Sequence, residues 1–202
     1  MALSLFNEKG LPNVKLQNIA DACSISVGNL AYHFKFKEDL IVTIADQISA
    51  ELSPKVKVDH KFPSLLDFDN QLSIYHSLIN KYVFFFLDVV ELKRTLPIIH
   101  KQRVQNINMM ITQIHQWILE NVPKGIFKEE IHPDQHAHTA HAIWMLISFW
   151  MTQKKVLSKN GMDEEHFKIV VWNQLLPNFT DLGLMEYEAM ILPQLRAVEL
   201  DV

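Results

Sequence analysis

Apolar residues recur along most of the chain at intervals of three and four positions, the spacing of one face of an α-helix. Gly and Pro are confined to a few points, and the long stretches between them are typical of helices and uncommon in hairpin-rich sheets. The pattern therefore predicts an all-α protein. The predicted helices are one ending at Lys9, then 16–23, 27–34, Lys37 to about Leu52, 66–92, 97–121, 133–157, 164–176 and 182–199.

The predicted helices differ in length between two parts of the chain. Those in the N-terminal quarter are mostly short, and short helices are unstable alone in water, so they must pack together as a small unit. The later helices are longer and have the pattern of a helical bundle. We therefore expect two domains, residues 1–50 and residues 51–202.

Residues 16–34, LQNIADACSISVGNLAYHF, have the pattern of two short helices around a tight turn, a helix-turn-helix. The inner stripe of the first helix consists of Leu16, Ile19, Ala20 and Cys23. Ser24, Ile25 and Ser26 then break that helix. We expect Ile25 to be buried in the turn and Ser26 to cap the second helix.

The second helix presents two different faces. Leu30 and Phe34 lie four positions apart on the inner face, with Val27 beside them. The outer face is polar and aromatic, and it consists of Gly28, Asn29, Tyr32 and His33. This arrangement is typical of a recognition helix that enters DNA.

Each outer residue type suits a contact with DNA. A glycine in the first turn allows the helix N-terminus, which is partly positive, to approach phosphate closely. Asn29 can donate and accept at a base edge, and Val27 or Ala31 can contact a thymine methyl group. Tyr32 and His33 can reach phosphate oxygens. Lys37 begins the next helix beside the same face, and we expect it to clamp a phosphate.

The sequence around this motif resembles the DNA-binding domain of the tetracycline-repressor (TetR-type) family of bacterial transcription regulators. The resemblance spans about the first fifty residues and lies in LFNEKG, in VKLQNIADACSISVGNLAYHFKFKEDLI and above all in the pattern GNLxYHFKxKEDL. It implies that Val27, Gly28 and Asn29 approach bases. It also implies phosphate contacts by Asn29, Tyr32, His33 and Lys37, and that Gln17 flanks the DNA backbone from the supporting helix.

Four positions depart from the family pattern. Ala31 stands where the family usually has an aromatic residue that contacts DNA, so we expect that contact to be missing or shifted. Lys15 replaces the usual threonine cap of the supporting helix, and Ser24 replaces the usual turn glycine. Both local geometries should therefore be less favourable. Met1 falls inside the family's first helix, so the family's basic N-terminal arm is absent from this sequence.

Hydrophobic residues make up 49% of the chain, more than one modest core requires, which suggests an oligomer interface or an internal pocket. In the segments 140–157 and 167–176 the apolar residues cover too wide an arc for a helix buried on one side only. These residues are Trp144, Phe149, Trp150, Val170, Val171 and Trp172. Two helices from each subunit would form a four-helix homodimer interface, as the family resemblance also implies.

Aromatic and methionine residues of the C-terminal part are candidates for an effector pocket, although most of the excess could equally be core. The candidate ligand-binding residues are Phe85, Met109, Met110, Trp117 and Trp144. In a TetR-like bundle the apolar interior is also the effector cavity, and such walls adapt to varied apolar ligands. We expect a hydrophobic or amphipathic small molecule and no cofactor.

Four histidines leave an alternative open. Residues three and four positions apart on a helix can chelate a metal, so a metal-dependent helical enzyme could be built on His132, His136, His138 and His141. The same residues could instead line an interface or pocket, or make the domain sensitive to pH. The sequence has no Ser/His/Asp triad pattern, Gly-rich phosphate loop, CxxC pair or HExxH, so we do not expect an enzyme. A carrier of apolar ligands without DNA binding would leave GNLAYHFKFK unexplained.

Net charge and cysteine content limit how much of the surface can bind DNA and in which compartment the protein is expected. The net charge of −4 and the pI of about 6.2 confine any DNA contact to a local surface. One cysteine, Cys23, excludes an intrachain disulfide and favours a reducing cytoplasm. The apolar run 140–151 is shorter than the ~20 residues of a membrane span, and no secretory signal is visible. We therefore expect a cytoplasmic protein without membrane contact.

Together these features predict a dimeric repressor released from double-stranded operator DNA by a small effector. Its two recognition helices must lie about one DNA turn apart, ~34–36 Å. An effector that prefers a wider arrangement lowers the affinity for DNA. The helix from Lys37 to about Leu52 connects the two expected domains and is the candidate lever.

Overall fold

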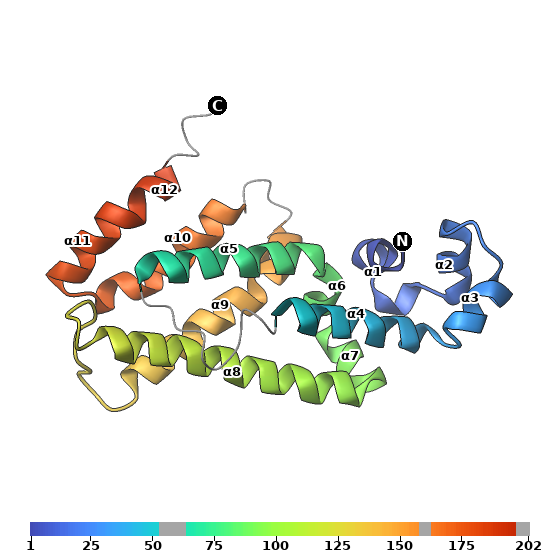
Figure 1. Cartoon of the computed structure of the whole chain (residues 1–202), viewed down its shortest axis with the longest axis horizontal. Helices are drawn as coiled ribbons and strands as arrows, with labels where there is room; N and C mark the ends of the chain where they lie inside the picture. Colours follow the sequence, from blue (N-terminus) through green and yellow to red (C-terminus); the bar gives the residue numbers. More distant parts are fainter. Residues whose placement is uncertain (53–63, 158–162, 197–202) are drawn as a thin grey trace. The chain divides into compact units, whose positions relative to one another are not determined.

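The fold is known from a computed structural model that describes residues 1–52, 64–157 and 163–196 (Figure 1). Within these ranges the chain forms twelve α-helices and two short 3₁₀ helices, and it forms no strand beyond one isolated bridge between Phe127 and Phe179. The predicted all-α class is confirmed. No helix in the described ranges is long and apolar enough to cross a membrane.

The described residues divide into two compact units. The first contains residues 1–52 and 79–106, and the second contains residues 64–78, 107–157 and 163–196. Helix α4 (Lys37–Leu52) lies entirely in the first unit. Helices α5 (Leu65–Lys81) and α8 (Pro97–Asn121) each contribute residues to both units. Within the described residues, α5 and α8 therefore contain the points where the chain passes from one unit to the other, whereas the described residues of the proposed lever α4 belong to the first unit.

The first unit combines the N-terminal helices with a segment from the middle of the chain. Besides α4 its helices are α1 (Ala2–Lys9), η1 (Leu11–Asn13), α2 (Leu16–Ala22), α3 (Val27–His33), α6 (Val83–Leu87) and α7 (Val89–Thr95). Phe6 of α1 is fully buried, and its ring centroid lies 5.4 Å from that of Phe84 in α6. Asn7 adds two hydrogen bonds, one to the Lys81 carbonyl (3.0 Å) and one from the Phe84 N–H (3.1 Å). The start of the chain is thus fastened to α6.

The single helix predicted over 66–92 is wrong, because the chain breaks at Tyr82 and Asp88 into α5, α6 and α7. Both break residues have non-helical backbone angles. At the first break the Asn7 side chain takes up the N–H of Phe84, and at the second the Asp88 carboxylate accepts the N–H of Leu11 (2.8 Å). A distant side chain therefore takes up a backbone group freed at the first break, whereas at the second break the side chain of Asp88 itself binds a distant backbone group.

The predicted helix over 182–199 is also divided, into α11 (Asp181–Met190) and α12 (Leu192–Arg196). Pro193 has no N–H to continue α11, but it is tolerated in the first turn of a new helix. The last three residues of that prediction, 197–199, lie outside the described residues.

The second unit is built around packed aromatic rings. Its other helices are α9 (Gln135–Leu157), α10 (Glu164–Leu175) and η2 (Leu176–Asn178). Helices α5 and α8 run antiparallel: Phe68 stacks on Trp117 with centroids 4.2 Å apart, and the Tyr75 hydroxyl donates to Met110 Sδ (3.1 Å). Further rings surround this stack, most of them edge-on, from Phe127, Trp172, Phe179 and Tyr187.

A buried ion pair joins α5 to α10 in this unit. The Asp69 carboxylate, 1% exposed, accepts hydrogen bonds from Lys168 Nζ (2.7 Å) and from Trp172 Nε1 (2.9 Å). A buried charge is tolerated when it is paired and hydrogen-bonded in this way. The contact fixes Trp172 inside the chain.

Part of the predicted dimer interface is therefore wrong. Trp172 and Val171 are fully buried within the single chain, and Trp150 is 6% exposed. Their apolar surface is already covered by α5 and by neighbouring rings, such as Phe167 beside Trp150 at 5.3 Å. A wide apolar arc on α10 thus reflects burial on several sides within one subunit.

Candidate nucleic-acid interface

Helix α3 begins at a well-formed N-cap. Ser26 has extended backbone angles, and its Oγ accepts a hydrogen bond from the N–H of Asn29 (3.1 Å). The predicted cap is confirmed. Figure 1 shows α2 and α3 next to one another, with α4 leading away from the end of α3.

The turn between α2 and α3 is held by backbone hydrogen bonds. Ser24 has a left-handed φ of 56°, and its N–H donates to the Asp21 carbonyl (3.0 Å). The N–H of Ile25 donates to the Ala20 carbonyl (3.0 Å), which completes a Schellman motif. The expectation that Ile25 is buried is wrong, since its side chain is 37% exposed and the turn does not depend on it. Cys23, expected on the inner stripe, is also exposed at the end of α2.

The start of α2 has half of a reciprocal cap. Asn18 Oδ1 accepts the N–H of Lys15 (2.8 Å). The Lys15 side chain has no acceptor atom, so it cannot return a bond to the N–H of Asn18 as a threonine would. The substitution at Lys15 therefore leaves the cap one-sided.

The outer face of α3 is open to solvent. Leu30 is buried, and Val27 and Phe34 are half-buried beside it. The exposed residues are Gly28, Asn29, Tyr32 and His33. Tyr32 is 86% exposed, and its ring stands edge-on to that of His33 with centroids 5.1 Å apart. The inner and outer faces of α3 are thus the ones that the sequence pattern indicated.

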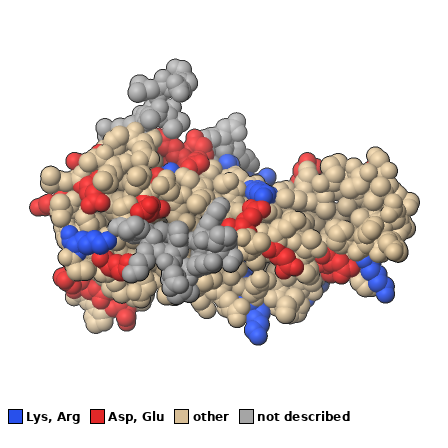
Figure 2. Space-filling view, in the orientation of Figure 1, with Lys and Arg blue, Asp and Glu red and all other residues tan. Residues whose placement is uncertain are grey.

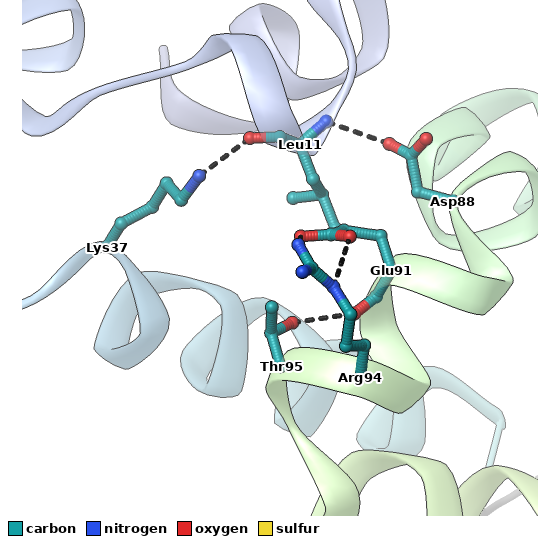
Figure 3. A network of polar contacts seen from close by, with 6 residues as sticks. All are labelled: Leu11, Lys37, Asp88, Glu91, Arg94 and Thr95. Atoms are coloured by element: carbon teal, nitrogen blue, oxygen red, sulfur yellow. Dashed lines mark hydrogen bonds and ion pairs between the residues drawn. The ribbon is translucent and has the colours of Figure 1, made fainter.

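The two flanking candidates differ in their surroundings. Gln17 is exposed on α2, and its Nε2 donates to Asp21 Oδ1 (2.7 Å). Lys37 is half-buried, and its Nζ donates to the Leu11 carbonyl (2.7 Å), as Figure 3 shows. Leu11 is in turn bound through its N–H to Asp88. Sequence reasoning missed Leu11 and Asp88, because no local pattern signals a contact across 77 positions.

The electrostatic character of this surface is modest. On the face drawn in Figure 2, the N-terminal helices at the right carry mostly uncharged side chains. The basic residues of positions 1–52 are Lys9, Lys15, Lys35 and Lys37. Any affinity for a polyanion must therefore come from a few placed groups.

Comparison with known families assigns both parts of the chain. Residues 1–44 match the family model described as "Bacterial regulatory proteins, tetR family", and residues 45–183 match the one described as "Bacterial transcriptional repressor". The chain belongs to the TetR family. TetR regulators bind DNA and are not enzymes, so the metal-enzyme and carrier alternatives are set aside.

Solved structures of TetR type share the fold. A regulator from Marinobacter aquaeolei VT8 has a TM-score of 0.81 and 24% identity, over 94% of this chain and 92% of that one. A regulator from Saccharomonospora viridis, solved in complex with choline, has a TM-score of 0.71 and 17% identity, over 88% of this chain and 93% of that one. A Haloarcula marismortui regulator follows with a TM-score of 0.64 and 15% identity, over 88% and 93%. No curated protein matches.

The four histidines considered as metal ligands do not form a metal site in this TetR protein. Three of them, His132, His138 and His141, are exposed, whereas His136 is 2% exposed. Among the described residues no group of three or more His, Cys, Asp or Glu side chains could hold a metal ion. The geometry gives the metal interpretation no support.

The ligand-binding candidates fall in both units of the TetR chain. Phe85 belongs to the first unit, where Arg103 Nη1 donates to its carbonyl (2.5 Å) and the guanidinium lies 4.8 Å from its ring centroid. Burial lowers the pKa of Arg103 to about 10. The other four lie in the second unit: Met110 and Trp117 are buried, and Met109 and Trp144 are half-buried.

Replacing Ser24 by glycine should stabilise the helix-turn-helix. A left-handed conformation costs a non-glycine residue about 1–2 kcal/mol, partly offset by the larger backbone entropy that glycine loses on folding. We expect Ser24→Gly to raise the free energy of unfolding by about 0.5–1 kcal/mol, measured by urea denaturation. Ser26→Ala, which removes the cap two residues on, should lower it by about 1 kcal/mol. A destabilised Ser24→Gly would contradict the left-handed turn.

Proposed function

We propose that this protein is a homodimeric repressor that binds operator DNA through α3 and is released by a small apolar or amphipathic effector. The observation that carries the proposal is the outer face of α3. Asn29, Tyr32 and His33 are exposed together on a helix whose inner side is packed and whose first turn is capped by Ser26. Side chains held on a rigid element can read a duplex without first becoming ordered.

The three side chains have different tasks in this proposal. Asn29 lies one turn before His33 and carries both a donor and an acceptor, so it suits a base edge in the major groove. Tyr32 and His33 stand edge-on to one another and offer groups suited to phosphate oxygens. Gln17 on α2 and Lys37 on α4 flank them as further backbone contacts.

Binding measurements on two α3 variants distinguish base contacts from phosphate contacts. The DNA consists of duplexes that the wild-type protein recovers from a random-sequence pool. Tyr32→Phe, which removes one hydroxyl, should weaken binding about fivefold and equally on all sequences, because a phosphate contact is sequence-independent. Asn29→Ala should lose about 1–3 kcal/mol on preferred sequences and flatten the preference at one or two base pairs. Fluorescence anisotropy measures both.

The control for the operator experiment is Met185→Ala, which removes an exposed side chain of α11 in the second unit and should leave affinity unchanged. Unchanged binding by both α3 variants would contradict the proposed interface. Recovery of no duplex by the wild type would contradict operator binding itself.

Dimerisation is proposed through an exposed apolar stripe on α9. Met145 is 50% exposed, Phe149 60% and Val156 74%, and spacings of four and seven residues place them on one face. Large apolar groups aligned on one helix face are typical of an interface. Exposed His138 and His141 continue the same face towards the start of α9.

A charge on the α9 stripe should separate the subunits. Phe149→Asp places an unpaired charge where the partner helix would cover it, and we expect the dimer to lose at least about 3 kcal/mol of association free energy. Sedimentation velocity should then show monomers. Val90→Asp is the matched control, since Val90 is an 80% exposed apolar residue on α7. A Phe149→Asp protein that stays dimeric would place the interface elsewhere.

The effector is proposed to bind in the second unit beside Met109, Met110, Trp117 and Trp144. Trp117 is 2% exposed, and its Nε1 has no hydrogen-bond partner among the described residues. The buried Tyr75 hydroxyl donates to a thioether, which is a weak acceptor. Buried donors beside aromatic side chains favour an amphipathic molecule that carries an acceptor oxygen.

Reciprocal coupling tests the effector proposal. A panel of amphipathic carboxylates, esters and ketones is first tested for compounds that raise the melting temperature. A compound that acts as effector should bind about 5–150-fold more weakly when the recovered duplex is present, because the coupling free energy is shared by both ligands. Trp117→Phe should weaken compounds with an acceptor oxygen more than matched hydrocarbons. Equal affinity with and without duplex would mark the compound as a non-effector.

A further inference from the structure

We propose that Asp88, which lies far from the helix-turn-helix in sequence, positions Lys37 for phosphate binding by holding the backbone of Leu11. The inference rests on the proposed function, in which Lys37 contacts DNA. All three residues belong to the first unit, and Figure 3 shows them in one line, with Leu11 between the carboxylate and the ammonium group.

Leu11 is held at both of its backbone groups. Its N–H donates to Asp88 Oδ2 (2.8 Å), and its carbonyl accepts from Lys37 Nζ (2.7 Å). Its side chain is 1% exposed, so the residue cannot shift without disturbing the core. Both bonds involve a charged side chain, and charge-assisted hydrogen bonds are stronger than neutral ones.

Asp88 is directed at Leu11 instead of at its own helix. It occupies the N-cap position of α7, where an aspartate usually accepts an N–H of the following turn. Within the described part of the chain its side chain makes no such cap bond. Its oxygens lie 3.6 and 3.8 Å from the position that a Cβ on Gly10 would occupy, and Gly10 has a left-handed φ of 74°. The carboxylate thus binds the backbone of the turn at Gly10 and Leu11 instead of capping α7.

The hydrogen bond to Leu11 orients the Lys37 side chain but uses only one of the N–H donors of its ammonium group. A lysine ammonium has three N–H donors on a flexible stem, and one donor on Leu11 leaves two for a phosphate. A side chain that is already oriented loses less rotamer freedom on binding, an advantage of about threefold to tenfold in affinity. Asp88 holds the turn that contains the Leu11 carbonyl, and this carbonyl orients Lys37. Asp88 therefore influences the affinity for DNA through Lys37 and without contacting DNA itself.

Long-range charge makes the opposite prediction. If Asp88 acted only through its negative charge, removing that charge would strengthen binding to a polyanion. Glu91 provides the comparison, because it lies three residues further on in α7 and pairs with Arg94 (3.0 Å), as Figure 3 shows. A loss of DNA affinity on removing the Asp88 carboxylate therefore indicates that Asp88 positions Lys37, whereas a gain indicates an effect of long-range charge.

The test is a double-mutant cycle on a duplex recovered by the wild-type protein from a random-sequence pool. Asp88→Ala should lower affinity about threefold to tenfold with Lys37 present and should have no effect in a Lys37→Met background. Lys37→Met alone should reduce the salt slope of binding by about one unit, and Asp88→Ala should move the slope towards that value. Asp88→Asn keeps one acceptor oxygen and should fall between. Glu91→Ala should not weaken binding.

Three results would overturn the proposal. The first is an equal loss of affinity from Asp88→Ala in both backgrounds. The second is a gain of affinity equal to that of Glu91→Ala. The third is a Lys37→Met protein with unchanged affinity and salt slope. In all three the wild type still binds the duplex and operator binding through α3 stands, whereas a wild type that recovers no duplex removes both proposals. If Asp88→Ala does not fold, the milder Asp88→Asn decides by the same cycle.

Discussion

The helix-turn-helix depends on the burial of a few apolar side chains beneath its two helices of seven residues each, α2 and α3. Helices of this length are unstable in water and persist only by packing. Ile19, Ala20 and Leu30 supply the inner side, and Phe6 closes the core against Phe84 of α6. The unit that contains the helix-turn-helix is therefore completed by residues from the middle of the chain.

The two units are stabilised in different ways. In the first unit, side chains such as Asn7 and Asp88 bind backbone groups at the breaks between helices, so polar contacts set where the short elements end. In the second, long helices pack through the Phe68–Trp117 stack and the Asp69–Lys168 ion pair. Stacked rings and a buried ion pair restrict the ways in which α5, α8 and α10 can pack.

Local periodicity was sufficient to predict the all-α class, the bounds of α8 and the two faces of α3, because each follows from neighbouring residues. It failed where contacts with residues distant in the sequence determine where a helix ends or which side chain is buried. At the break at Tyr82 the Asn7 side chain takes up the N–H of Phe84, and at the break at Asp88 the carboxylate binds the N–H of Leu11; both partners are distant in the sequence. It failed again for Trp172, whose burial depends on Asp69, 103 positions away. At the candidate site, the exposed residue types were predictable, but the partner of Lys37 was not.

The exposed Cys23 at the end of α2 gives the native chain a practical property. It is the one thiol in the sequence, and it lies in the helix-turn-helix. A maleimide dye would therefore attach at a single position, beside the surface proposed to meet the duplex. Energy transfer from that dye to a fluorophore on the end of a duplex would report docking and orientation in real time. No residue would have to be replaced to place the label.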